Sequence, residues 1–370
     1  MDRVRKSALD TLNRCFGSGA WSVQTLDSQI RTLGFDERDA AFCTWLVFGV
    51  IRNYALLDWW MEEYCVPKDL PVRNILRLGL FQIRFSEDIP DSAAVNECVD
   101  LCKSSGYKSA AGLVNAVLRK AAKSEARMPD EMSVRFSQPP WLVERMISEH
   151  GREFTLKFLE ANNKEAGIVR RTAFCPGEIY VQDEAAYQAV QMLNPKPGMR
   201  VLDSCSAPGG KSFTAAVMME NKGEIVACDI HEKKTALVAN NAKRLRIDII
   251  STLTADAREF RQEFFESFDA VIADVPCSGI GVIRKKPEIR FKTAEEIAGL
   301  PEIQRKILSN VSRYLKPGGK LLYSTCTVLK EENEDIASDL KGFHMLNSKT
   351  FWPHIDGTDG FYAAVLMKDE

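Results

Sequence analysis

From residue 199 onward the chain alternates short apolar segments with helical ones, and this alternation limits the fold more than any other feature. The apolar segments read MRVLDS, EIVACDI, IISTLTAD, FDAVIADVPC and GKLLYSTC. Between them we expect helices that begin near Lys211 and His231, a helix around residues 257–265, and one before Leu315. Short strands separated by helices form a mainly parallel sheet with helices on both faces. The sequence therefore predicts an α/β domain over residues 196–370, with ligands bound beyond the carboxyl ends of its strands.

The first 128 residues have a different pattern, that of a separate all-α domain. Apolar residues recur at helical spacing, as in Val4, Ala8 and Leu12, and the turns between such segments are short. About six helices connected in this way predict a helical bundle. Trp45 and the pair Trp59–Trp60 are expected in its core rather than in a ligand site. Residues 129–195 then form connecting helices and a shorter mixed segment.

Composition limits the environment and the partners. The net charge is −2, so RNA binding would depend on local patches rather than on overall charge. Ten cysteines without regular spacing indicate reduced thiols in a cytoplasmic protein. No apolar segment approaches the length of a membrane span, and the histidines are too dispersed to suggest a metal site. We expect a monomer that binds neither membrane nor metal.

Acidic residues and thiols follow the predicted strands where these end. Asp203, Asp229 and Asp256 end three of them, and Cys277 and Cys326 end two more. The segment VLDSCSAPGGK places two glycines before a helix, yet it lacks the glycine spacing of a P-loop or of a dinucleotide fingerprint. A nucleoside without a phosphate fits this loop better. A single aspartate of this kind is usually a helix cap, but three at successive strand ends favour a binding site.

Three of these motifs, DSCSAPGGK, DVPCSGIGVIRKKPEIR and YSTCTVLKEENE, resemble the signature motifs of the Sun-type (Nop2/Sun, RsmB) RNA cytosine-5 methyltransferases. The helical N-terminal region is similar to the NusB-like domain of the bacterial RsmB branch. The resemblance implies a seven-stranded methyltransferase domain that uses S-adenosylmethionine. It also implies that Asp229 binds the ribose and Asp256 the adenine of the cofactor. By the same resemblance, Asp274 lies between the cofactor and the target base. The loop that it assigns to the methionine end of the cofactor consists of Cys205, Ser206, Ala207, Pro208, Gly209, Gly210 and Lys211.

The two thiols suit the chemistry of cytosine methylation. C5 of cytosine is a weak nucleophile until a thiolate adds to C6 and turns the ring into an enamine. By motif position Cys326 resembles the family nucleophile and Cys277 the cysteine that assists release, while Asp274 would accept from the cytosine amino group. The alternative is that both thiols are small buried core residues.

The target base must leave its stack to reach thiols inside a cleft. The basic segment after Cys277 lies next to this cleft in sequence and is predicted to hold RNA phosphates. Its basic residues are Arg284, Lys285, Lys286, Arg290 and Lys292. The family also carries a sizeable RNA-binding subdomain after residue 163, for which only residues 164–181 are available here.

These features predict methyl transfer from S-adenosylmethionine to C5 of a cytosine in ribosomal RNA, most simply that of the small subunit. The same reaction on transfer RNA or another RNA is the first alternative. The second is a non-catalytic RNA-binding or ribosome assembly factor, which would have no use for the two thiols and the cofactor loop.

Overall fold

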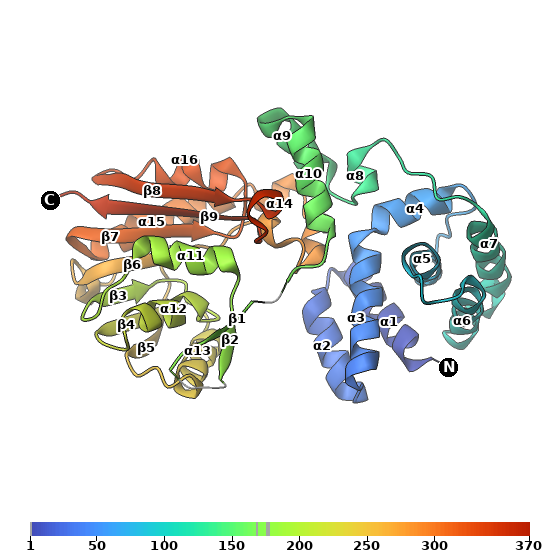
Figure 1. Cartoon of the computed structure of the whole chain (residues 1–370), viewed down its shortest axis with the longest axis horizontal. Helices are drawn as coiled ribbons and strands as arrows, with labels where there is room; N and C mark the ends of the chain where they lie inside the picture. Colours follow the sequence, from blue (N-terminus) through green and yellow to red (C-terminus); the bar gives the residue numbers. More distant parts are fainter. Residues whose placement is uncertain (1, 168, 175–177) are drawn as a thin grey trace. The chain divides into compact units, whose positions relative to one another are not determined.

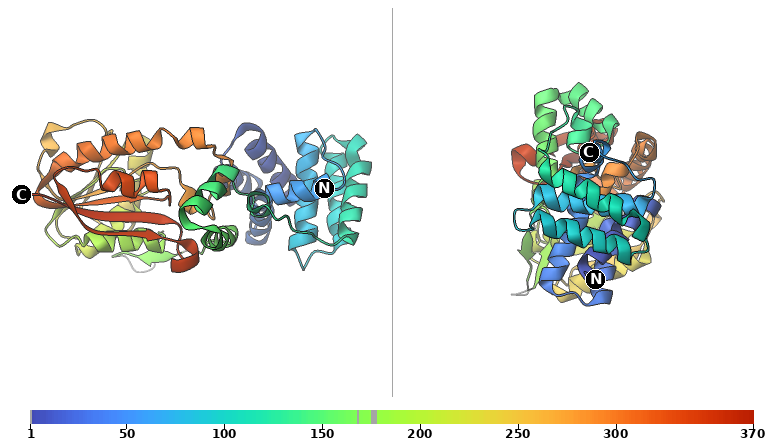
Figure 2. Two further views of the ribbon diagram at one scale, coloured as in Figure 1. Left: turned by 90° about the horizontal axis from the view of Figure 1, so that it is seen from above. Right: turned by 90° about the vertical axis from the view of Figure 1, so that its right-hand side faces the viewer.

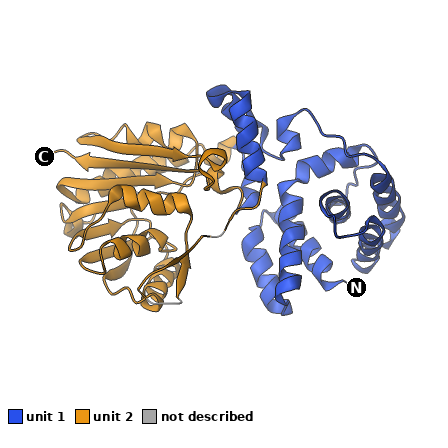
Figure 3. Cartoon of the chain, in the orientation of Figure 1, with its two compact units in different colours: residues 1–163, 285–293 blue, residues 164–284, 294–370 orange. Residues whose placement is uncertain are grey.

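The computed structural model describes residues 2–167, 169–174 and 178–370. The chain divides into two compact units (Figure 3). The helical unit consists of residues 1–163 and the short segment 285–293, and the sheet unit contains the remainder. This division differs from the three consecutive segments expected from the sequence, because residues 285–293 leave the sheet unit and pack within the helical one.

The helical unit is an all-α bundle built around one core. That core contains Leu12, Leu46, Ile51 and Leu57, all fully buried, and Trp45 and Trp59 pack against it. Its elements are α1 (Arg3–Ser18), α2 (Ser22–Leu33), α3 (Glu37–Arg52), α4 (Tyr54–Glu62), α5 (Leu70–Phe85), α6 (Asp91–Ser104), η1 (Lys108–Ala110), α7 (Ala111–Lys123), α8 (Met132–Arg135), α9 (Pro140–His150), α10 (Arg152–Asn163) and, from the returning segment, η4 (Pro287–Phe291).

In the sheet unit a seven-stranded sheet carries the fold, in the order β5-β4-β3-β6-β7-β9-β8 (Figure 1). Strand β9 pairs antiparallel with both β7 and β8, and the other strand pairs described in this sheet are parallel. The strands are β3 (Arg200–Asp203), β4 (Glu224–Asp229), β5 (Ile250–Thr254), β6 (Phe268–Asp274), β7 (Leu315–Thr325), β8 (Phe343–Phe351) and β9 (Phe361–Lys368). A separate hairpin, β1 (Arg170–Thr172) with β2 (Ile179–Val181), precedes the sheet.

Successive residues of the central strands face opposite sides of the sheet. Val201 points to the layer formed by α11, α12 and α13, whereas Leu202 points to the layer that contains α15 and α16. Figure 2 shows these layers on opposite faces. The helices and 3₁₀ turns of this unit are α11 (Glu184–Leu193), α12 (Gly210–Met218), α13 (Glu232–Arg244), η2 (Gln262–Phe264), η3 (Ile280–Val282), α14 (Ala294–Ile297), α15 (Leu300–Val311), η5 (Ser312–Tyr314), η6 (Lys330–Glu332), α16 (Glu334–Ala337) and α17 (Pro353–Asp356).

The predicted fold class is confirmed: an all-α N-terminal region precedes a seven-stranded, mostly parallel sheet. One expected element is wrong, because residues 257–265 contain only the 3₁₀ turn η2 and no α-helix. Within the described part of the chain no single helix has the length and apolar character to cross a membrane. Helices α3 and α4 meet those criteria only as a pair bent by 69°.

Candidate active site

The parallel strands bring the polar residues at their ends to one edge of the sheet. Asp203, Asp229 and Asp274 are the last residues of β3, β4 and β6, and Cys326 directly follows β7. Because β3, β4, β6 and β7 pair in parallel in register, their carboxyl ends lie side by side. The sequence places these residues correctly at one edge.

The two thiols lie in contact at the ends of β6 and β7. Asp274 pairs with Ser324 in the sheet, so the residues that follow each strand run beside one another. The Sγ atoms of Cys277 and Cys326 are 3.2 Å apart, and both side chains are partly exposed. The hydrogen bond to Cys326, burial, and the nearby charges of Cys326 and Glu332 raise the pKa of the Cys277 thiol. Cys277 therefore holds its proton more strongly than an ordinary cysteine.

Beside the thiols, the Asp274 carboxylate is fixed by two partners. The Lys211 ammonium lies 2.7 Å from its Oδ2, and the Ser324 hydroxyl donates to its Oδ1 at 2.8 Å. Lys211 comes from the start of α12, so this ion pair ties the glycine-rich loop to the end of β6. Asp274 lines both of the cavities described next.

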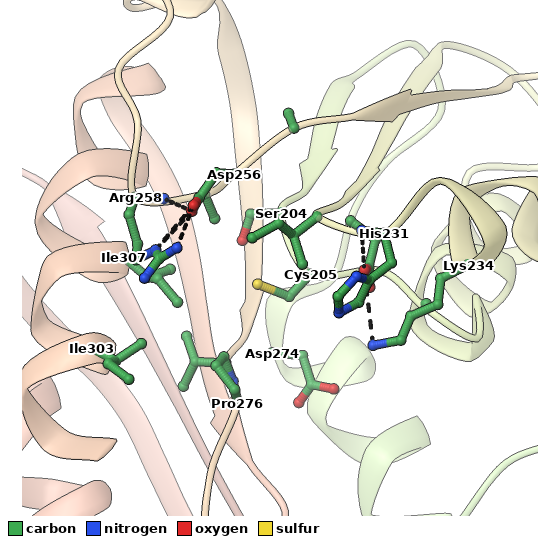
Figure 4. A pocket seen from close by; sticks show the side chains of 16 residues that line it. Ser204, Cys205, His231, Lys234, Asp256, Arg258, Asp274, Pro276, Ile303 and Ile307 are labelled. Atoms are coloured by element: carbon green, nitrogen blue, oxygen red, sulfur yellow. Dashed lines mark hydrogen bonds and ion pairs between the residues drawn. The ribbon is translucent and has the colours of Figure 1, made fainter. Parts of the chain in front are cut away.

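The larger cavity has a volume of about 370 Å³, within the usual range of small-molecule sites. Asp229 and Asp256 line it from the ends of β4 and β5, as Figure 4 shows for Asp256. The guanidinium of Arg258 donates to both Asp256 oxygens at 2.5–3.1 Å, and this contact lowers the pKa of that carboxyl. Apolar side chains Ile303 and Ile307 from α15 also line the cavity, on the same side as Arg258 (Figure 4). With Asp274, the cavity thus combines apolar side chains with three carboxylates.

The smaller cavity, of about 160 Å³, is formed by the glycine-rich loop and the segment before α11. Three polar atoms here are buried and have no hydrogen-bond partner of ordinary geometry among the described residues: Asp203 Oδ1, Gln182 Nε2 and Ser206 Oγ. The Asp203 oxygen is a carboxylate acceptor, the Gln182 nitrogen is an amide donor, and the Ser206 oxygen belongs to a hydroxyl that can donate or accept. Burial raises the pKa of Asp203 to about 7, against the opposing effect of the Ser212 hydrogen bond and the Lys211 charge.

The predicted loop residues distribute over these two cavities. Cys205 and Ala207 line both, while Ser206, Pro208, Gly210 and Lys211 line the smaller one. Gly209 lines neither and has a structural role instead. Its φ is +108°, and an added Cβ would lie 2.3 Å from the ring of Phe213. Cys277 and Cys326 line neither cavity, but Val275 and Pro276, just before Cys277, line the larger one.

The structure corrects two of the five predicted RNA contacts. Arg284 is 8% exposed and pairs with Asp359 at 3.0 Å in the sheet unit. Arg290 is 1% exposed and donates to Asn162 O and Asn163 Oδ1 in the helical unit, and burial lowers its pKa to about 9. Neither guanidinium is available to a phosphate. The residues that are still predicted to contact RNA are Lys285, Lys286 and Lys292.

Sequence reasoning missed several residues around the cavities. Gln182 and Arg258 were not selected, although Gln182 directly precedes the α11 cap Asp183 and Arg258 follows Asp256 by two residues. Asp203 was recognised as a strand-end carboxylate but was not assigned to a ligand. No group of three or more His, Cys, Asp or Glu side chains in the described ranges is arranged to hold a metal ion.

Known proteins match this chain in both units. Residues 2–123 match the NusB family, and residues 190–367 match a family described as 16S rRNA methyltransferase RsmB/F. The probable ribosomal RNA small subunit methyltransferase B of Bacillus subtilis (strain 168) is 32% identical, over 99% of this chain and 98% of that protein. The chain belongs to the RsmB/F family of 16S rRNA methyltransferases. It is thus an enzyme of a family of S-adenosylmethionine-dependent rRNA cytosine methyltransferases, as the motifs predicted.

A second relative and one solved structure are also similar to this chain over its full length. The ribosomal RNA small subunit methyltransferase B of Erwinia tasmaniensis is 29% identical, over 100% of this chain and 99% of that protein. The crystal structure titled PH0851 superposes with a TM-score of 0.79 at 24% identity, covering 100% of this chain and 99% of that one. At this identity the superposition shows a common fold.

The alignment with the Bacillus subtilis relative shows that this RsmB/F chain is the shorter of the two. It extends over 441 positions, whereas the chain has 370 residues, so at least 71 positions have no counterpart here. The short hairpin β1–β2 occupies the segment where the sequence predicts a reduced RNA-binding subdomain. Arg171 of this hairpin pairs with Glu184, which leaves Arg170 as its more accessible arginine.

Proposed function

We propose that this enzyme transfers a methyl group from S-adenosylmethionine to C5 of a cytosine in small-subunit ribosomal RNA, through a covalent bond between Cys326 and C6. The observation that carries the proposal is the pair of thiols 3.2 Å apart at the ends of adjacent strands. Two buried cysteines used only as core residues would have no need of an adjoining ion pair and two polar cavities.

The donor groups in the cavities fit S-adenosylmethionine. The unpartnered Asp203 oxygen would accept from an ammonium group, and the unpartnered Gln182 amide and Ser206 hydroxyl would donate to a carboxylate. Together they match the two charged groups of an amino acid. Asp229 would hold the ribose hydroxyls in the larger cavity, and Asp256 the adenine amino group. When bound, the cofactor supplies an electrophilic methyl group on a positively charged sulfur.

Within the chain, Cys326 acts as the nucleophile. Its thiolate forms a bond to C6, and the electrons of the C5–C6 double bond move toward C5, which takes up the methyl group. A solvent water takes the proton from C5, the electrons of that C–H bond restore the double bond, and the C6–sulfur bond breaks with its electron pair on the sulfur. Cys277 donates its proton to the departing sulfur, across the 3.2 Å that separates the two Sγ atoms, and is protonated again from solvent.

Asp274 orients the target base. Lys211 and Ser324 fix its two oxygens in place, and each oxygen keeps a lone pair that can accept from a cytosine amino group. Uracil has a carbonyl at that position, which a carboxylate repels. This contact selects cytosine.

Cysteine variants test the proposal. Cys326→Ala abolishes methyl transfer to ribosomal RNA, and Cys277→Ala accumulates an enzyme–RNA adduct that survives denaturing electrophoresis. The exposed thiol of the helical unit gives a matched control, since Cys65→Ala retains activity and forms no lasting adduct. An adduct that accumulates in Cys326→Ala would reverse the two assignments.

The missing aligned positions favour one alternative target. A chain with fewer residues than its relative has less surface for a large ribosomal substrate, so the same chemistry on transfer RNA is the second candidate. Bisulfite sequencing of ribosomal and transfer RNA from a deletion strain separates the two, because only the true target loses its methylcytosine signal. Unchanged methylation of small-subunit RNA would refute the preferred target.

A further inference from the structure

A buried carboxylate outside both cavities holds the loop that carries Cys277. Glu332, at the end of η6, is 1% exposed. Its Oε2 accepts from the backbone N–H of Ser278 and from the Gln304 amide, both at 2.8 Å. The same amide of Gln304 donates to Pro276 O at 3.0 Å. The residues on both sides of Cys277 are thereby fixed by one carboxylate and one amide.

The next residue, Asn333, does the same for the other thiol. Its amide donates to Thr327 O at 3.1 Å, and its Oδ1 accepts from the Thr325 hydroxyl at 2.5 Å, so it holds the residues on both sides of Cys326. The Ser278 hydroxyl then donates to Thr327 Oγ1 at 2.8 Å and joins the two loops directly. Two adjacent residues of one turn thus set the separation of the thiols.

Glu332 also places a negative charge near the thiols. Its second oxygen, Oε1, is buried and accepts no hydrogen bond from the part of the chain that the structure describes. Its contacts described above are with an N–H and a neutral amide. Such a charge is poorly screened in a buried setting and acts on neighbouring ionisable groups.

The other groups that face Cys277 are accounted for. Cys326 lies at the end of β7, and the Tyr323 hydroxyl from the same strand donates to Glu332 O at 2.6 Å. Tyr323 is fully buried, and burial raises the pKa of its hydroxyl, so it stays neutral; the Arg305 charge from α15 opposes this effect. Asp274 is neutralised by Lys211. Among these groups Glu332 is the carboxylate without a paired cation.

We propose that Glu332 is a positioning residue of the methyl-transfer reaction, which holds the Cys277 loop beside Cys326 and determines which of the two thiols carries the proton. The inference rests on the proposed function, in which Cys277 is the proton donor and Cys326 the nucleophile. A fixed negative charge favours the neutral form of a nearby thiol, and this is the form that Cys277 needs in order to protonate the departing sulfur.

Glu332→Gln tests the charge while keeping the size of the side chain and an oxygen that accepts from Ser278. In the full chain with Cys326→Ser, the rate of Cys277 alkylation by iodoacetamide is followed against pH by mass spectrometry. We expect Glu332→Gln to lower the pH midpoint by about one unit. Glu302→Gln on α15, whose exposed carboxylate pairs with Lys306, leaves the midpoint unchanged.

In the chain with both thiols, Glu332→Gln reduces the rate of methyl transfer about tenfold and accumulates the enzyme–RNA adduct. The KM for S-adenosylmethionine is unchanged, because Glu332 lines neither cavity. A merely structural role would lower thermal stability without moving the alkylation midpoint, and an unmoved midpoint in a folded variant overturns the inference. Full methylation by Cys326→Ala would instead refute the proposed function, so the two failures are distinguishable.

Discussion

Gly281→Ala is the substitution whose effect on the thiol pair can be worked out most directly from the structure. Gly281 follows the Cys277 loop at the middle of η3. Its N–H donates to Cys326 O at 3.0 Å, and its carbonyl accepts from the Gly360 N–H at 2.8 Å. The backbone at this residue therefore joins three segments: the Cys277 loop, the end of β7 and the loop before β9.

An added methyl group has no room there. A Cβ at residue 281 would lie 1.9 Å from Gly360 O and 2.9 Å from Cys326 O, whereas real Cβ contacts are essentially never below 3.0 Å. The separation between residue 281 and the Gly360 carbonyl must therefore grow by at least 1.1 Å, which moves backbone on one side or both. Overpacking of this kind costs about 1–3 kcal/mol of stability. A displacement of about 1 Å at a reacting group costs on the order of a hundredfold in rate.

Differential scanning calorimetry and a methyl-transfer assay measure the two effects. We expect a free energy of unfolding lower by about 2 kcal/mol and a rate lower by about a hundredfold, with S-adenosylmethionine affinity retained, since Gly281 lines neither cavity. Gly299→Ala is the matched control because a Cβ there meets nothing within 4 Å and φ is −83°. Wild-type activity in Gly281→Ala would refute the close packing on which the thiol geometry depends.

Contacts elsewhere in the two units give three more tests. Hydrogen peroxide should oxidise Cys277 and Cys326 to a disulfide and itself be reduced to water, because sulfurs 3.2 Å apart need to move by only about 1 Å to bond. Peptide mass mapping detects the linked peptides. Two separate thiols after oxidation would contradict the prediction. The affinity for S-adenosylmethionine should rise with pH through about 7, the raised pKa of Asp203, because only the carboxylate attracts an ammonium. Calorimetry at several pH values should find this dependence lost in Asp203→Asn. Phe291→Ala should destabilise the helical unit by about 3 kcal/mol in thermal scans, since two ring centroids lie 5.1 Å from Phe291; an unchanged transition would show that this ring is not part of the core.

The positions of the five parallel strands along the chain were predictable because they follow from local sequence, whereas the order of the strands in the sheet was not predicted. The period of two within each strand and the polar residue at its end are visible without the structure. The absence of a helix at residues 257–265 was not predictable, because backbone carbonyls of this segment accept hydrogen bonds from side chains about 50 residues later in the sequence. Asn310 donates to the carbonyls of Ala257 and Glu259, and the Tyr314 hydroxyl also donates to Glu259 O. These side chains, from the end of α15 and from η5, replace the helical hydrogen bonds.

That both thiols end strands was predictable from the same local pattern, whereas their separation of 3.2 Å follows from the pairing of β6 with β7, which local sequence does not show. The role of Glu332 was not, since its partners Ser278 and Gln304 lie 54 and 28 residues away in sequence. A glutamate in an acidic segment, KEENE, reads as exposed. Only the three-dimensional contacts distinguish it from the neighbouring acidic residues.

The basic segment after Cys277 shows why charge in a sequence does not by itself locate an RNA surface. Arg284 is fixed within the sheet unit by Asp359, and Arg290 within the helical unit by Asn162 and Asn163. Burying a guanidinium is costly unless it is bonded, so each arginine is a strong local anchor. The chain between them is thus held at both ends, directly after the loop that carries a reacting thiol.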